Sequence, residues 1–569
     1  MSQPARLTAL PAPVRDPFAA RWPLASTVAD RERGPLPHGT PGAVLRRTAE
    51  VLGEPRVPST GVGESAALDL IAGLLSVNGI DLSHPHAAAH LQPPVLQVAV
   101  DADALASASN ASMDTYDSGP ATLAIEQWVV KALAGLAGFG PSADGVLTPG
   151  GSISNLLAVL IARDSAAAAA GIDVRRDGVQ GLLRPVVFCS ELAHFSVQRA
   201  CAALGLGEQA VVTIPSDEDF RLRIDVLEAE LAVPGRTPVA VVATAGTTDF
   251  GSIDPIAPIA ALARAHGVWL HVDAAYGFGA LFSDRLAPLL AEVSLADSVT
   301  LDLHKIGWQP AATSVLLVAD RKRFSAFDRS VDYLNPADDI DSGLDGLLGR
   351  SLQTTRRPDA VKVATTLTAY GRAGLGTMLD TCHELAHAAA ARIVADSNLE
   401  LLAPVTLTTV LFRIVRQGLP DLQDVPDRRD LRDVPDGRDL RDLQDLPDGQ
   451  DLQDVLDGRD LQDVLDGRDL QDVRDGRDRR NLQDGRDVRD LPPAELDALQ
   501  GEVRRRLLTS GRVLIGRTKV PARGGRPAAV ALKLTLLNPN ATATDIEDLL
   551  DQVVATALDV LTETGEGAA

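Results

Sequence analysis

The sequence predicts an α/β fold in which a mostly parallel sheet is covered by helices on both faces. In the middle of the chain, short β-branched runs alternate with alanine- and leucine-rich runs of helical spacing, and this alternation is typical of parallel sheets with helical crossovers. The hydrophobic content of 45% supplies a large core. The length of 569 residues exceeds what one core holds, so two or three domains are expected.

The predicted elements of the first part of the chain begin with an arm. Residues 1–64 are rich in proline, arginine and glycine and are expected to be partly disordered. Helices are expected from about Ser65 and over Ile125–Leu136, where apolar residues recur at helical spacing. Strands are then expected over Val186–Cys189, Val211–Ile214, Val239–Thr244, Val268–Val272, Val299–Leu301 and Ser314–Val318. Helices between them are expected over Leu156–Arg163, Phe195–Leu204, Val226–Leu231 and Ile256–His266.

A smaller α+β unit is predicted from the C-terminal part of the chain. Its expected helices are Ala360–Tyr370, Thr377–Val394, Leu491–Ser510 and Asp545–Leu561. Its expected strands are Val405–Val415, Val513–Ile515 and Val530–Leu537. The predicted domains are therefore an N-terminal arm (1–64), a large domain (65–355), a small domain (356–417 and 491–569) and an insertion (418–490).

The insertion is a repeat of about nine residues, clearest over Asp451–Arg468. Residues 421–490 contain 23 Asp and 13 Arg, a net charge of −10 against −23 for the whole chain. Dense Asp, Arg and Gly leave little apolar area to offset the entropy of ordering, which predicts disorder. Calcium binding by the aspartates is the alternative. The Gly-Gly-x-Gly-x-Asp pattern of calcium-binding nonapeptide arrays is missing, and arginine accompanies nearly every repeat.

Composition and charge exclude several classes of protein. A net charge of −23 argues against nucleic-acid binding, which needs a basic face. An apolar run of about 18 residues is missing, so neither a membrane span nor membrane association is expected. The three cysteines are far apart and lack metal-type spacing, so no metal is expected. We expect a reducing, cytoplasmic compartment and no disulfide framework.

Residues that suit chemistry follow the predicted strands. Ser298–Lys305 ends a strand with a histidine and a lysine, and Asp273 ends the strand before it. Thr148–Asn155 contains a Gly-Gly-Ser turn that opens a helix, where free backbone N–H groups bind phosphate. Taken singly, each has an ordinary structural explanation. Because α/β sheets bind ligands at the carboxyl ends of their strands, we expect these residues to share a site.

The order and spacing of five sequence blocks resemble those of the group II pyridoxal-phosphate decarboxylases, which act on glutamate, aromatic and diamino acids. The blocks are Thr148–Asn155, the segment around His194, Ala245–Thr248, His271–Tyr276 and Ser298–Lys305. The resemblance covers about residues 65–417 and 491–560. It implies a fold type I enzyme with a seven-stranded type of sheet, pyridoxal 5'-phosphate as cofactor, amino acid decarboxylation, and a homodimer with shared active sites.

The same resemblance implies roles for individual residues. Lys305 is the implied Schiff-base lysine, Asp273 faces the pyridine nitrogen, and His194 stacks over the ring. Tyr333 matches a loop tyrosine that protonates Cα, which adds a fourth catalytic residue. The implied cofactor-binding residues are Gly151, Ser152, Ile153, Ser154, His194, Thr248, Asp273, Ala275, Asp302, His304 and Lys305. The implied substrate-binding residues are Arg356 and Lys533.

The substrate class depends on a departure from the usual family pattern. Most of the family has Asn-Pro-His-Lys where this chain has Asp302-Leu-His304-Lys305. Together with Gln309-Pro310, this resembles the diamino acid decarboxylases of siderophore pathways, so 2,4-diaminobutyrate is expected first, then lysine or ornithine. Glutamate or aromatic decarboxylation remains an alternative. Further alternatives are a fold type I aminotransferase or lyase, and a non-catalytic binding protein of the same fold.

Overall fold

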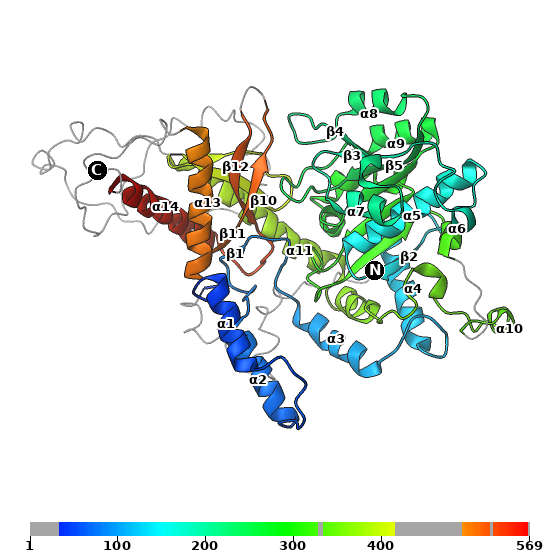
Figure 1. Ribbon diagram of the computed structural model, residues 1–569, viewed down its shortest axis with the longest axis horizontal. Coiled ribbons are helices and arrows are strands. Elements are labelled where there is room, and N and C mark those ends of the chain that lie inside the picture. Colours follow the sequence, from blue (N-terminus) through cyan, green and yellow to red (C-terminus); the bar gives the residue numbers. More distant parts are fainter. Residues whose placement is uncertain (1–33, 328–333, 416–491, 524–526, 567–569) are drawn as a thin grey trace, which may run out of the picture.

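The computed structural model describes residues 34–327, 334–415, 492–523 and 527–566. They form a large and a small domain, each built on its own sheet (Figure 1). The predictions for the first 33 residues, for Tyr333 and for the insertion 418–490 lie outside the described residues.

The large domain contains a seven-stranded sheet in the order β2-β8-β7-β6-β5-β3-β4, which confirms the predicted mostly parallel sheet. Strands β4, β3, β5, β6 and β7 pair in parallel, and β8 is antiparallel to both β7 and β2. The strands are β2 (Asp144–Thr148), β3 (Pro185–Ser190), β4 (Val211–Ile214), β5 (Thr237–Thr244), β6 (Trp269–Asp273), β7 (Ser298–Asp302) and β8 (Ser314–Val318). The sequence analysis missed β2, whose Asp144 and Gly145 are weak strand formers.

Both faces of this sheet are covered. In β3, Val186 and Phe188 pack into one hydrophobic cluster and Val187 and Cys189 into another, because successive side chains of a strand point to opposite faces. The first cluster includes residues of α3, α4, α8 and α9, and the second includes residues of α5 and α7. These helices are α3 (Gln97–Ser109), α4 (Pro120–Leu136), α5 (Gly151–Ala169), α7 (Ser196–Ala203), α8 (Ile224–Leu231) and α9 (Ile256–His266).

The small domain is built on a five-stranded sheet in the order β1-β11-β12-β10-β9. Its strands are β1 (Ala87–Ala88), β9 (Leu399–Leu401), β10 (Thr409–Ile414), β11 (Leu514–Val520) and β12 (Ala529–Thr535). The helices α13 (Pro493–Ser510) and α14 (Ala543–Glu566) bury leucine and valine side chains against it. This is the predicted α+β unit.

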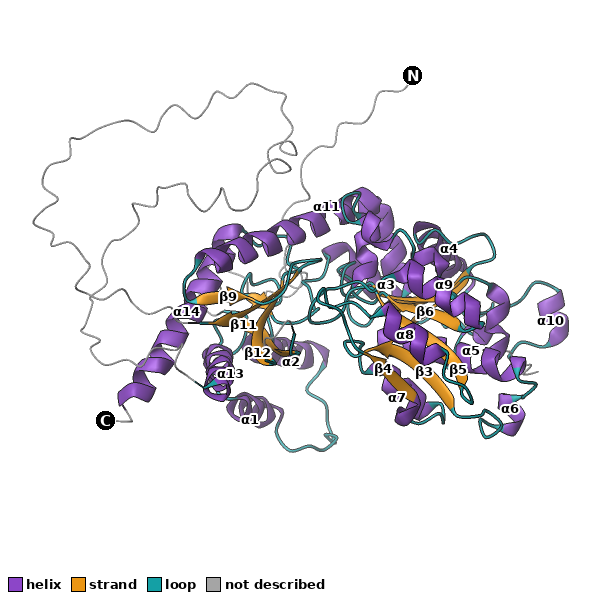
Figure 2. Ribbon diagram, turned by 90° about the horizontal axis from the view of Figure 1, so that it is seen from above, coloured by secondary structure: helices purple, strands orange, loops and turns teal. Residues whose placement is uncertain are grey.

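Two features cross the predicted domain boundaries. Helix α11 (Ala360–Ala395) runs along both domains (Figure 2), contributing Val363 and Leu379 to the large core and Ala386 and Ile393 to the small one. Two separate helices were predicted here, and only Gly371, at φ 60°, interrupts the element. Strand β1 pairs with β11 of the small sheet, although its residues fall within the predicted large domain. A two-residue strand carries no periodicity that a sequence could show.

The N-terminal part of the described chain forms two helices with exposed surfaces. Helix α1 (Pro41–Leu52) lies within the predicted arm, where Thr40 caps it and proline occupies its first turn. Helix α2 (Glu64–Asn78) follows, and neither helix contains a buried residue. Among the described residues, no helix combines the length and apolarity that a bilayer crossing requires.

Candidate active site

A cavity of about 270 Å³ lies at the carboxyl ends of β3, β5, β6 and β7. Parallel pairing brings these ends together, since Thr244 of β5 is opposite Asp273 of β6, and Asp273 is opposite Thr300 of β7. The cavity is lined by most of the predicted site residues, namely Gly151, Ser152, His194, Thr248, Asp273, Ala275, Asp302, His304 and Lys305. Residues far apart in the sequence are thus brought into one site.

Lys305 lies in the turn that follows β7, beside a buried carboxylate. Its Nζ is 3.1 Å from Oδ2 of Asp302, whose side chain is 4% exposed. The other oxygen of Asp302 is buried without a hydrogen-bond partner among the described residues. Nε2 of His304 is 3.8 Å from Oδ2 of the same carboxylate. The His304 ring is oriented by the Thr313 backbone, whose carbonyl oxygen lies 2.9 Å and whose nitrogen lies 3.2 Å from Nδ1.

Asp273 ends β6 and is held by a chain of buried polar groups. Its Oδ2 accepts a hydrogen bond from Asn155 Nδ2 at 2.7 Å, and its Oδ1 accepts one from the Ala275 N–H at 3.1 Å. The Asn155 Oδ1 atom is 3.0 Å from Nε2 of His271, and Nδ1 of His271 is 2.8 Å from Ser298 Oγ. Burial lowers the pKa of His271 to about 4, so the ring is neutral near pH 7.

The tautomer of His271 follows from its partners. An amide oxygen only accepts, so Nε2 carries the proton and Nδ1 accepts from Ser298. Asn155 therefore has its oxygen turned to His271 and its NH₂ group turned to Asp273. The network fixes both the position and the acceptor character of the carboxylate.

His194 reaches the cavity from the segment between β3 and α7. Its Nδ1 is 2.9 Å from Ser196 Oγ, which also accepts a hydrogen bond from Asn155 at 2.9 Å. Burial lowers the pKa of His194, with Asp273 opposing and Lys305 adding to the shift. A neutral imidazole therefore faces the cavity, tied through Ser196 and Asn155 to the Asp273 network.

The Gly-Gly-Ser turn forms one wall of the cavity at the N-terminus of α5. A Cβ atom on Gly151 would lie 2.9 Å from Asp302 Oδ2 and 3.3 Å from Ala275 Cβ, so only glycine fits. Ser152 also lines this wall. Ser154 points away, with its Oγ 2.7 Å from Thr148 Oγ1 and 2.9 Å from Ser314 Oγ. Ile153 packs against the second hydrophobic cluster, so neither Ile153 nor Ser154 lines the cavity.

The predicted substrate-binding residues lie outside the cavity lining. Arg356 is buried, and its Nη1 is 2.7 Å from Oε1 of Glu126. This ion pair ties the segment before α11 to α4. Lys533 of β12 has its Nζ 2.7 Å from Asp249 Oδ1 and 3.5 Å from the carbonyl of Thr248, which lines the cavity. Tyr333 lies outside the described residues.

Two residues of the site were missed by the sequence analysis. Asn155 lies one helical turn after Gly151, and a buried asparagine on the apolar face of a helix was the signal that could have found it. Tyr276 also lines the cavity and is held by Thr408 and Thr409, whose Oγ1 atoms are 2.8 Å and 3.1 Å from its hydroxyl oxygen. Those partners are on the small domain, so sequence spacing could not reveal the contact.

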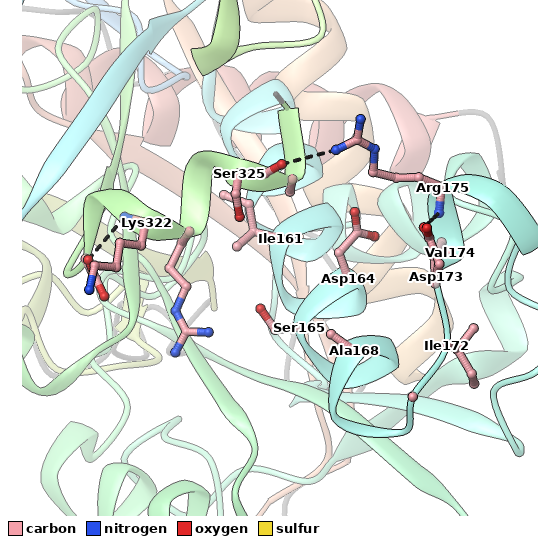
Figure 3. Close-up of a pocket in the computed structure, with 14 residues that line it drawn as sticks. Ile161, Asp164, Ser165, Ala168, Ile172, Asp173, Val174, Arg175, Lys322 and Ser325 are labelled. Atoms are coloured by element: carbon pink, nitrogen blue, oxygen red, sulfur yellow. Dashed lines mark hydrogen bonds between the residues drawn. The ribbon is translucent and has the colours of Figure 1, made fainter. Parts of the chain in front are cut away.

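A larger cavity, of about 660 Å³, lies on the outer surface between α5, α6 (Val174–Asp177) and the segment Arg321–Phe327 (Figure 3). Arg175 reaches across it and donates a hydrogen bond to the carbonyl of Ser325 at 3.3 Å. The predicted site residues are not among those that line it. Volume alone therefore does not locate the site, and the smaller cavity carries the chemical groups.

The model of the pyridoxal-dependent decarboxylase conserved domain matches residues 73–415. The chain belongs to the pyridoxal-dependent decarboxylase family. As a member, this decarboxylase is a carboxy-lyase that uses pyridoxal phosphate and acts on an amino acid.

The decarboxylase is similar to characterised relatives over most of its described core. An L-2,4-diaminobutyrate decarboxylase of Rhizobium meliloti is 43% identical over 371 residues, covering 65% of this chain and 72% of the relative. One of Acinetobacter baumannii is 37% identical over 372 residues, covering 63% and 73%. A crystal structure from Vibrio parahaemolyticus superimposes with a TM-score of 0.71 at 28% identity, covering 95% and 96%. It shows the glutamate decarboxylase domain of diaminobutyrate-pyruvate transaminase and L-2,4-diaminobutyrate decarboxylase.

Proposed function

We propose that this decarboxylase converts a basic diamino acid to the corresponding amine and carbon dioxide, with 2,4-diaminobutyrate as the preferred substrate and lysine or ornithine next. The observation that carries the proposal is the Asp302–Lys305 pair at 3.1 Å in the cavity, in the Asp-Leu-His-Lys form. The two relatives named L-2,4-diaminobutyrate decarboxylase support the substrate class.

The residues of the cavity fit the cofactor. Pyridoxal phosphate, when bound, accepts the electron pair released as the bond between Cα and the carboxylate breaks. Asp273, whose carboxylate is fixed by Asn155 and Ala275, would hold a proton at the pyridine nitrogen. Thr248 and Ala275, which line the cavity, would pack against the ring.

The remaining residues hold the phosphate, the amine and the substrate. Gly151 and Ser152 would present the N-terminus of α5 to a phosphate dianion, and His304 would add a contact. Asp302, 3.1 Å from the Lys305 amine, would orient it for covalent attachment. The neutral His194 would cover the other face of the ring and lie near the substrate carboxylate.

A panel of amino acids tests the proposed substrate class. The purified protein is incubated with pyridoxal phosphate and 2,4-diaminobutyrate, lysine, ornithine, glutamate or an aromatic amino acid, and carbon dioxide release and amine formation are measured. We expect the highest kcat/KM for 2,4-diaminobutyrate. A preference for glutamate or an aromatic amino acid contradicts the substrate class. Keto acid in place of carbon dioxide contradicts decarboxylation.

We further propose that Tyr333 protonates Cα after carbon dioxide leaves. Replacement by phenylalanine keeps the ring and deletes only the proton donor, so amine formation should fall on the order of 10²-fold while cofactor affinity changes little. Carbon dioxide and amine are quantified separately, since a diverted reaction changes their ratio. Tyr370→Phe, on α11 and packed against the large core, is the matched control. Unchanged amine formation in Tyr333→Phe would show that another group donates the proton to Cα.

The protein is proposed to act as a homodimer in the cytoplasm. Helix α2 exposes Leu68, Ile71 and Leu75 at helical spacing, by 51%, 45% and 59% respectively. Helix α1 adds Leu45 at 70%. An apolar surface of this kind suits burial against a second subunit. The three cysteines are free and buried, which suits a reducing compartment.

Charges on α2 are expected to break the dimer. The double variant Leu68→Asp/Leu75→Asp places two carboxylates in the apolar surface, so analytical ultracentrifugation should show monomers where the wild type is dimeric. Ser65→Asp, at an exposed position in the first turn of the same helix, is the matched control and should stay dimeric. A dimer that survives the double variant would place the subunit interface elsewhere.

A further inference from the structure

An ion pair joins the two domains beside the cavity. Asp249 follows Thr248 in the turn after β5 of the large domain, and Lys533 lies on β12 of the small domain. The distance between Lys533 Nζ and Asp249 Oδ1 is 2.7 Å. Oδ2 of the same carboxylate accepts a hydrogen bond from the Thr518 hydroxyl at 2.6 Å. Both partners from the small domain therefore converge on one carboxylate.

The surrounding structure holds this pair in place. The turn that carries Asp249 is closed by backbone hydrogen bonds from Gly246 N–H to Ser252 at 3.0 Å and from Gly251 N–H to Thr247 at 2.8 Å. On the other side, Gly516 of β11 is opposite Lys533. A Cβ on Gly516 would lie 3.0 Å from the lysine Cε, so glycine leaves the room that the lysine stem occupies.

The more accessible partner of this ion pair is the carboxylate. The Asp249 side chain is 35% exposed, whereas that of Lys533 is 9% exposed and already in contact with the carboxylate. A carboxylate has about four lone-pair directions, and two donors contact Asp249 in the part of the chain that the structure describes. Burial lowers the pKa of the nearby His90, with Lys533 and Arg504 adding to the shift, so His90 brings no further positive charge near pH 7.

We infer that Asp249 is a specificity-determining residue that binds the distal ammonium group of the substrate, with Thr518 as a positioning residue. Thr248 lines the cavity and its carbonyl is 3.5 Å from Lys533 Nζ, so the ion pair lies directly beside the cavity lining. A distal ammonium gains a contact with an accessible carboxylate. A distal carboxylate meets like charge, since the lysine is already paired.

The inference rests on the proposed diamino acid function and is tested by comparing substrates that differ in the distal group. Asp249→Asn keeps the shape and removes the charge. With 2,4-diaminobutyrate, KM should rise about 10- to 100-fold with little change in kcat, as expected for loss of one charged hydrogen bond. With 2-aminobutyrate, which lacks the distal amine, KM should stay within about twofold. Lys533→Met removes the cation that competes for the Asp249 carboxylate, so KM for 2,4-diaminobutyrate should fall while KM for 2-aminobutyrate stays within about twofold.

The control is Asp219→Asn, an exposed aspartate paired with Arg221, which should leave both KM values unchanged. Thermal melting confirms that each variant folds, and Lys533→Met provides the test if Asp249→Asn does not fold. A wild type that releases carbon dioxide only from other amino acids overturns the proposed substrate class. If the wild type prefers 2,4-diaminobutyrate, and Asp249→Asn has the same ratio of KM for 2,4-diaminobutyrate to KM for 2-aminobutyrate as the wild type, only the role of Asp249 is overturned. A rise in KM for both substrates assigns Asp249 a structural role and also overturns the inference.

Discussion

Replacing Lys305 with alanine is expected to abolish covalent attachment of pyridoxal phosphate and to lower turnover on the order of 10³-fold or more. The amine is 3.1 Å from Asp302 in a turn at the end of β7, so no neighbouring side chain can take its place without moving the turn. The visible absorbance of the wild-type protein should disappear in the variant. Borohydride reduction should leave no cofactor bound to it.

The exposed Lys322→Ala variant is the matched control for this experiment, because that lysine lies at the outer cavity of Figure 3 and away from the site. It should keep both the absorbance and the activity. Peptide mapping of the reduced wild type identifies the modified lysine. Cofactor found on any lysine other than Lys305 would show that the assignment is wrong.

The change Asp273→Asn is expected to weaken cofactor binding and to cut turnover on the order of 10²-fold or more. The amide removes the negative charge that would hold a proton at the ring nitrogen. It also creates a conflict, because both oxygens of Asp273 accept hydrogen bonds, from Asn155 Nδ2 and from the Ala275 N–H. One of these donors would then face an NH₂ group.

Equilibrium dialysis gives the cofactor affinity of this variant, and steady-state kinetics with excess pyridoxal phosphate gives its turnover. Asp297→Asn is the control, since that carboxylate accepts a hydrogen bond from the Leu270 N–H at the opposite end of the sheet. Asp297→Asn should affect stability more than cofactor affinity. Near-normal turnover in Asp273→Asn would show that this residue does not interact with the ring nitrogen.

Local patterns in the sequence were enough to predict most of the elements. Helix α9 has the predicted bounds, Ile256–His266, because its alanine- and leucine-rich periodicity ends at a Gly267 in the left-handed region. The parallel strands were predicted from short apolar runs that are buried on both faces. Site residues placed next to strand ends, such as Asp273 and Lys305, were brought together, since parallel strands share one carboxyl edge.

Contacts between distant segments were decided only by the tertiary structure. Arg356 pairs with Glu126 of α4, and Lys533 pairs with Asp249 across the domains. Packing of α5 against the sheet forms a hydrogen-bond network around Asp273 that includes Asn155, His271 and Ser298. The sequence by itself determined the order of the elements and the groups at the strand ends, because periodicity and turn residues act locally. The partner of each buried charge depends on which segments pack together, and this follows only from the folded core.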